Sequence, residues 1–177
     1  MRLDSLKHIV RSVQAMMEAE RIIVFGSASL LASFPELGET PGSPLQTTYD
    51  ADLIPYPFEE EIGMMLDEAF GADRGFHRRY GYHADIVRPK VTETFPEGWE
   101  ERLVALGGVP NVFCLELHDM AAVKCFVGRE KDARQVVWLF KHGKLDAAVL
   151  RQRISAVAAP SDKVGQARGF LDGLVRG

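Results

Sequence analysis

Two aspartates, Asp50 and Asp52, stand one residue apart in a short run that is otherwise typical of a strand. Side chains alternate along a strand, so residues i and i+2 point to the same face, about 7 Å apart along the chain. We therefore expect Asp50 and Asp52 to share one face, with Ala51 and Leu53 on the other. Two carboxylates directed at one point repel each other unless a cation lies between them. The pattern predicts a magnesium site on this strand.

A second strand is predicted ahead of the acidic one. Residues 21–25 form a predominantly apolar run, as expected of a strand that is buried on both faces. Gly26 allows a tight turn, and Ser27 stands where a helix N-cap would lie, before a short helix that continues to Phe34. Such a turn offers N–H groups and a hydroxyl to a phosphate, although an ordinary strand-to-helix turn has the same pattern.

Periodicity predicts the remaining elements. Apolar residues recur at helical spacing in seven further segments: 6–17, 58–70, 96–106, 119–127, 129–143, 145–157 and 163–175. Asp119 is expected to cap the fourth of these helices. A strand is expected at residues 112–117, and a hairpin at 75–89, with strands at 76–80 and 82–88. The Pro- and Gly-rich residues 35–47 predict a long loop, which could be a lid, a contact surface or a tolerated insertion.

A third acid, Asp85, lies on the second strand of the expected hairpin. On that strand Asp85 shares a face with His83 and Val87. A carboxylate on a half-buried strand needs a partner or a metal. The residues alone leave two interpretations equally open: a metal ligand, or an exposed edge position paired with Arg78 or Arg79.

Composition excludes several classes of protein. The 177 residues suit one domain, or a domain with a small helical appendage, and the formal net charge of −4 gives no general argument for nucleic-acid binding. Cys114 and Cys125 stand in apolar contexts without metal-ligand spacing, so we expect reduced core residues. No apolar run approaches the ~20 residues of a membrane span, and the first residues show no signal-peptide pattern. We therefore expect a cytoplasmic protein without a membrane partner.

The order of these motifs resembles the nucleotidyltransferase fold of the DNA polymerase beta superfamily. The resemblance rests on Gly26 and Ser27 at a helix start, then Asp50-x-Asp52, then Asp85 on a later strand. It implies that Gly26 and Ser27 bind the triphosphate of a nucleoside triphosphate (NTP). It also implies that the three aspartates are catalytic and bind two Mg²⁺ ions.

The C-terminal half narrows the resemblance. Residues 117–124 (LHDMAAVK) and 128–132 (GREKD) resemble a pattern in the nucleotidyltransferase-like toxins of type IV toxin–antitoxin and abortive-infection systems. This resemblance implies that Lys124 faces the nucleotide phosphates and that Asp132 helps to organise the site. Arg129 is expected to add positive charge for the nucleotide. An ion pair from Asp132 to Lys124 or Arg129 and a purely structural cap both fit Asp132.

The sequence therefore predicts an α+β protein, with a small mixed sheet and a helical C-terminal part. We expect residues 1–117 to form a nucleotidyltransferase core and residues 118–177 to pack on it as helices. The predicted activity moves a nucleoside monophosphate from an NTP to an RNA end, a protein hydroxyl or a small molecule. The resemblance adds an antitoxin protein as a partner. The apolar segment after Ser27 and the long loop favour the alternative, a nucleotide- or partner-binding module without transfer.

Overall fold

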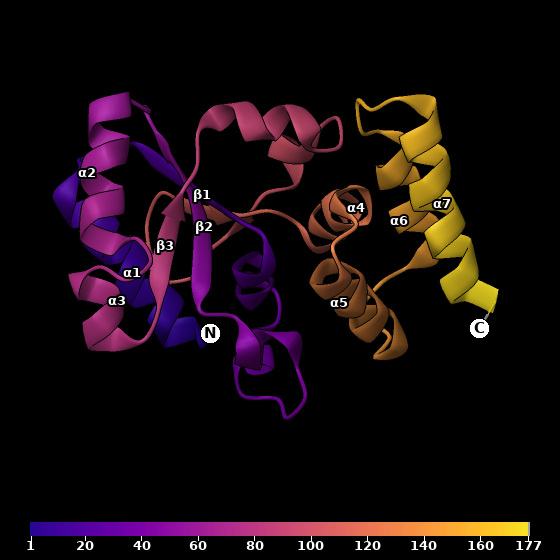
Figure 1. Ribbon diagram of the computed structural model, residues 1–177, viewed down its shortest axis with the longest axis horizontal. Coiled ribbons are helices and arrows are strands. Elements are labelled where there is room, and N and C mark those ends of the chain that lie inside the picture. Colours follow the sequence, from indigo (N-terminus) through magenta and orange to yellow (C-terminus); the bar gives the residue numbers. More distant parts are fainter. Residues whose placement is uncertain (177) are drawn as a thin grey trace. The chain divides into compact units, whose positions relative to one another are not determined.

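The computed structural model describes residues 1–176, which form two compact units (Figure 1). The sheet unit contains Met1–Lys90 and Leu103–Leu115. The helical unit contains Val91–Arg102 and the chain from Glu116 onward. The chain therefore enters the helical unit twice. That residues 118–177 pack on the core as one part stays a prediction.

The sheet unit is built on five strands in the order β3-β2-β1-β5-β4. These strands are β1 (Arg21–Phe25), β2 (Asp50–Tyr56), β3 (His83–Ile86), β4 (Val104–Ala105) and β5 (Val112–Cys114). β1 pairs antiparallel with β2 and parallel with β5, whereas β2 pairs parallel with β3 and β4 pairs antiparallel with β5. The sheet is thus mixed, and the predicted α+β fold is confirmed.

The two central strands differ in burial as their sequences predict. Ile22, Ile23 and Val24 of β1 are fully buried, as expected of a continuous apolar run. At the start of β2, Ala51 and Leu53 are fully buried, whereas the two aspartates that alternate with them are only half-buried. The predicted alternation is confirmed, and it leaves the acidic side chains on the less buried face.

Three α-helices lie against one face of β1–β3 in Figure 1: α1 (Leu3–Met16), α2 (Glu60–Phe70) and α3 (Gly75–Tyr80). α1 buries the apolar stripe that its 3.6-residue period predicts. α2 and α3 lie in the crossover from β2 to β3, which two parallel strands require. The region predicted as a long loop holds two short 3-10 helices, Pro35–Gly38 and Pro44–Thr47, and Leu37 and Leu45 anchor them in the core.

The predicted hairpin over residues 75–89 is wrong in its first half. Residues 76–80 belong to α3, so β3 has no antiparallel hairpin partner there and instead pairs parallel with β2. Phe76 and Tyr80 stand four residues apart, which brings their rings to one helix face with centroids 4.7 Å apart. Gly81 ends the helix with a left-handed φ of 78°.

The helix predicted over residues 96–106 is also wrong. This stretch holds a short 3-10 helix, Trp99–Arg102, followed by β4. Val104 and Ala105 pair with β5, so pairing with the next strand overrides the local helical spacing. Gly98, with a φ of 75°, interrupts any helix before this point.

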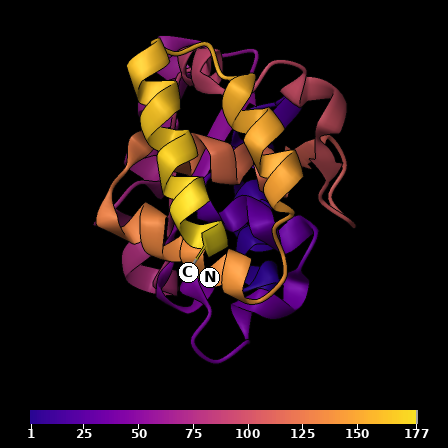
Figure 2. The same cartoon turned by 90° about the vertical axis from the view of Figure 1, so that its right-hand side faces the viewer.

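The helical unit contains four α-helices among the described residues: α4 (Leu117–Val127), α5 (Glu130–Lys141), α6 (Ala147–Ser155) and α7 (Ser161–Arg176). Figure 2 shows α6 and α7 side by side. The predicted cap at Asp119 is wrong, because the carboxylate of Glu116 accepts the first N–H groups of α4. Asp119 is instead fully buried and pairs with Arg102 at 2.9 Å and Arg153 at 3.1 Å. No helix within residues 1–176 combines the length and apolar character that crossing a membrane requires.

Candidate metal and nucleotide site

Three carboxylates converge on the less buried face of β2 and β3. Each of Asp50, Asp52 and Asp85 offers one oxygen, and these three oxygens lie within 4.8 Å of one another. The sheet explains the convergence, because Asp50 and Asp52 alternate on β2 and Asp85 stands directly opposite Asp52 on the parallel strand β3. All three side chains are half-buried. The structure thus brings together the three acids that the sequence singled out.

The triad has the chemistry of a divalent-metal site. Carboxylate oxygens are the hard ligands that Mg²⁺ prefers, and oxygens that share one Mg²⁺ at about 2.1 Å lie roughly 3–4 Å apart. The three oxygens of the triad lie within 4.8 Å of one another, near enough for one cation to contact them all after small side-chain rotations. Three negative charges this close repel one another, and a cation bound among them would offset that repulsion. The residues present therefore fit a metal ion.

Gly26 borders the triad. Its φ of 63° and ψ of −155° lie in a region that is essentially restricted to glycine. A Cβ at this position would stand 2.0 Å from Oδ2 of Asp52. Ser29 Oγ donates a hydrogen bond of 2.8 Å to the Gly26 carbonyl, which closes the turn. Ser27 follows directly and begins a 3-10 helix, Ser27–Ala32, where the sequence predicts a short helix.

A fourth side chain, that of His83, lies beside the triad, and no role for it is predicted from the sequence. His83 Nε2 lies 3.4 Å from Oδ1 of Asp85. The sequence does place both residues on one strand face, so their alternation was an available signal. In the folded chain the His83 side chain is only 15% exposed. This burial cannot be inferred from the strand pattern alone.

A second charged cluster lies in the helical unit. The buried carboxylate of Asp132 on α5 accepts hydrogen bonds from Lys124 Nζ and Arg129 Nε, both at 2.6 Å. Burial alone would raise the pKa of Asp132, but the hydrogen bonds from Arg129 and Lys124 outweigh it and lower the pKa. The predicted ion pair is therefore present with both cations. Lys124 is buried with its charge paired, whereas the Arg129 side chain is 60% exposed.

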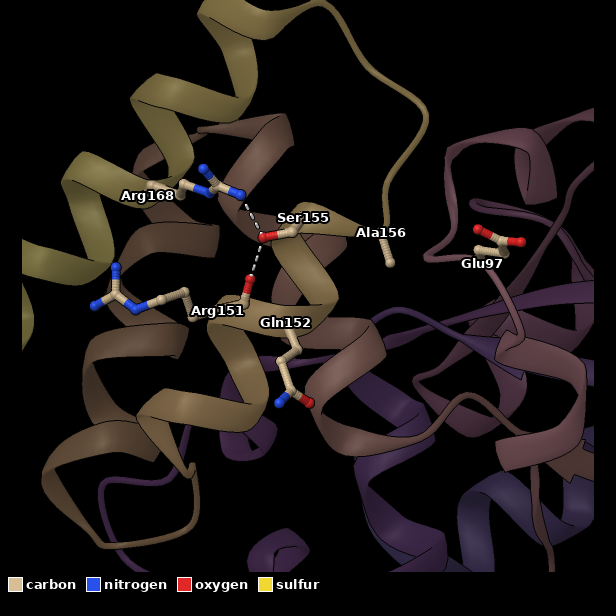
Figure 3. Close-up of a pocket in the computed structure, with 6 residues that line it drawn as sticks. All are labelled: Glu97, Arg151, Gln152, Ser155, Ala156 and Arg168. Atoms are coloured by element: carbon tan, nitrogen blue, oxygen red, sulfur yellow. Dashed lines mark hydrogen bonds between the residues drawn. The ribbon is translucent and has the colours of Figure 1, made fainter.

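The helical unit also contains an open hollow of about 640 Å³ (Figure 3). Arg168 donates a hydrogen bond of 2.6 Å to Ser155 Oγ, which itself donates one of 2.7 Å to the Arg151 carbonyl. Arg151 pairs with Asp172 at 2.6 Å. None of the predicted site residues lines this hollow, so it is not part of the proposed site.

An acidic triad beside a Gly-Ser turn, on a small mixed sheet, is the arrangement of a nucleotidyltransferase. The chain belongs to the family described as nucleotidyltransferases of unknown function (DUF6036), whose profile spans residues 1–169. No curated protein and no solved structure matches the chain significantly. The predicted nucleotidyltransferase resemblance is confirmed, and the triad is its candidate catalytic centre. The toxin–antitoxin resemblance stays a prediction.

Proposed function

We propose that this protein transfers a nucleoside monophosphate from an NTP to an acceptor hydroxyl, with Mg²⁺ held by Asp50, Asp52 and Asp85. The observation that carries the proposal is the convergence of these three carboxylates next to the Gly26 turn. Two Mg²⁺ ions bound there would neutralise the triphosphate and stabilise charge on the attacking and leaving oxygens.

The chain's own residues would bind the nucleotide and accept a proton. In the proposed reaction the acceptor oxygen forms a bond to the α-phosphorus, the bond from that phosphorus to the bridging oxygen breaks, and pyrophosphate leaves. Asp85 takes the hydroxyl proton as general base. The backbone N–H groups after Gly26 and the Ser27 hydroxyl bind the β- and γ-phosphates. The resemblance further supports roles in nucleotide binding for Lys124, Arg129 and Asp132.

Exposed side chains on α3 and directly before β2 support RNA as the acceptor. Arg78 and Arg79 are exposed on α3, and Tyr80 beside them is 43% exposed. Tyr49, directly before Asp50, is 56% exposed. Its backbone carbonyl accepts a hydrogen bond from the His83 N–H, at the end where β2 and β3 both begin. Arginines beside exposed aromatic rings suit a single strand, whose phosphates and bases they can bind together.

Label transfer tests this proposal. The full chain is incubated with MgCl₂, each α-³²P-labelled NTP and either cellular RNA or cellular protein. We expect label on RNA, and none with Asp52→Asn. Glu61→Gln on α2 is the matched control, because Glu61 is an exposed acid outside the triad. Equal labelling by Asp52→Asn and the parent would contradict the proposed role of the triad. Label on protein alone would overturn the choice of RNA.

The resemblance of residues 117–132 supports a finer proposal, that the transfer acts as the toxin of a toxin–antitoxin pair. Induced expression should then arrest growth, and Asp52→Ala should relieve the arrest at equal protein level. Harmless expression of an enzyme that is active in vitro would contradict the toxin role and leave the transferase in place.

One observation favours the alternative, a binding module without transfer. The 3-10 helix after Gly26 buries Ala28, Leu30 and Leu31 and so carries no cation for the phosphates. Magnesium-dependent NTP binding with no label transfer to any acceptor would support this alternative.

A further inference from the structure

We propose that His83 is a positioning residue that holds the carboxylate of Asp85 in its metal-binding orientation. The inference rests on the proposed function, since it concerns a ligand of the same metal site. It assigns to His83 a contact with Asp85, and no contact with the metal or the nucleotide.

The backbone holds His83 firmly beside the triad. His83 is the first residue of β3, and its N–H donates a hydrogen bond of 2.9 Å to the carbonyl of Tyr49. In the parallel register His83 stands opposite Asp50, and Asp85 stands opposite Asp52. The imidazole and the three carboxylates therefore share one face of two neighbouring strands.

The ring itself is held on one side and directed at Asp85 on the other. The His83 side chain is only 15% exposed, and its ring packs against that of His77 with centroids 4.6 Å apart. Nε2 lies 3.4 Å from Oδ1 of Asp85, a carboxylate that is itself 47% exposed. A largely buried ring thus limits the orientations of a more exposed ligand.

The second ring nitrogen shows that packing alone does not explain a histidine here. Nδ1 of His83 is buried and has no hydrogen-bond partner within residues 1–176, and an apolar side chain in its place would avoid that cost. A proton on Nε2 directs the N–H of the imidazole at Asp85 and leaves Nδ1 as the unfilled acceptor. Metal-binding carboxylates are commonly held by such neighbours, and their loss typically lowers metal affinity about 10- to 100-fold.

Binding of Mn²⁺ alone tests the inference without any catalytic step. Free Mn²⁺ is measured by electron paramagnetic resonance as it is titrated into the full-length chain. We expect His83→Leu to weaken binding by about tenfold or more. His83→Gln should retain most of the affinity, because its amide N–H can point at Asp85. His77→Phe is the matched control, because it keeps a ring against His83 and should bind as the parent does.

The outcomes separate this inference from the proposed function. If Asp50→Asn and Asp85→Asn bind Mn²⁺ as well as the parent, the triad is not the metal site and the proposed function fails. If those variants lose binding but His83→Leu keeps it, only the positioning role of His83 is overturned. Circular dichroism checks the fold of each variant. Should His83→Leu not fold, His83→Gln decides: a loss of binding as large as that of Asp85→Asn contradicts the inference.

Discussion

Gly26 is the residue at which the backbone and the metal site constrain each other most closely. Gly26→Ala would place a methyl group where Oδ2 of Asp52 lies. Because that oxygen ends a short flexible side chain, the fold can survive while the triad loses its geometry. We expect a loss of about 1–3 kcal/mol in stability and a clear fall in Mn²⁺ affinity.

Gly42 supplies the matched control for that variant. Its φ of 76° is also positive, but an added Cβ would meet nothing within 4 Å. Gly42→Ala should therefore cost stability through backbone strain and leave Mn²⁺ affinity unchanged. Unaltered affinity in Gly26→Ala, or an equal fall in both variants, would contradict the close approach of Gly26 to Asp52.

Cys114 is a buried core residue, as the sequence predicts, whereas Cys125 is only half-buried. Both thiols are free, and burial raises the pKa of Cys114 and of Cys125 to about 12. A thiol is nucleophilic as the thiolate, so both should react slowly with iodoacetamide at pH 8 in the folded chain and rapidly in denaturant. Mass spectrometry of the alkylated protein measures this difference. Rapid modification of the folded chain would contradict the burial.

Residue identity alone predicted part of the site. Strict alternation on one strand was enough to place Asp50 and Asp52 together. Asp85 needed the pairing of two strands, which the sequence suggested only through resemblance. His83 needed its burial and the packing of His77 as well, and neither can be inferred from one strand's pattern.

At the scale of elements, the prediction succeeded where the apolar residues of a segment have a clear helical period or form an unbroken run. The stripe of α1 and the continuous apolar run of β1 are two such cases. It failed at residues 76–80, where Phe76 and Tyr80 flank three basic residues and pack as neighbours on one helix face. It also failed at β4, whose two residues are strand only because β5 pairs with them.

The junction of α4 and α5 depends on one buried acid. Asp132→Asn would leave Lys124 buried without its counter-charge, so we expect a loss of about 3 kcal/mol in stability. The pKa of Asp132 is lowered in the folded state, so its contribution is present above the unfolded pKa of about 3.9 and is lost as the pH falls through the lower folded value. Thermal melts of parent and variant should therefore differ at pH 7, begin to converge below about pH 4 and coincide only below the folded pKa of Asp132. A gap independent of pH would contradict this pairing.

At the scale of the whole molecule, the predicted site residues are divided between the two units. The triad and the Gly26 turn lie in the sheet unit, whereas Lys124, Arg129 and Asp132 lie in the helical unit. The sheet unit alone thus holds every residue proposed to bind metal. Variants of the triad therefore test the proposed metal and nucleotide site independently of the helical unit.

Calorimetry of NTP binding is the most direct test of metal-dependent nucleotide binding at the triad. ATP, GTP, CTP and UTP are each titrated into the full chain with MgCl₂ and again with EDTA. The parent should bind at least one NTP only when Mg²⁺ is present, and the double variant Asp50→Asn/Asp52→Asn should lose that binding while it remains folded. Absence of metal-dependent binding in the parent, or equal binding by the double variant, would contradict the proposal that the triad holds the metal and the NTP.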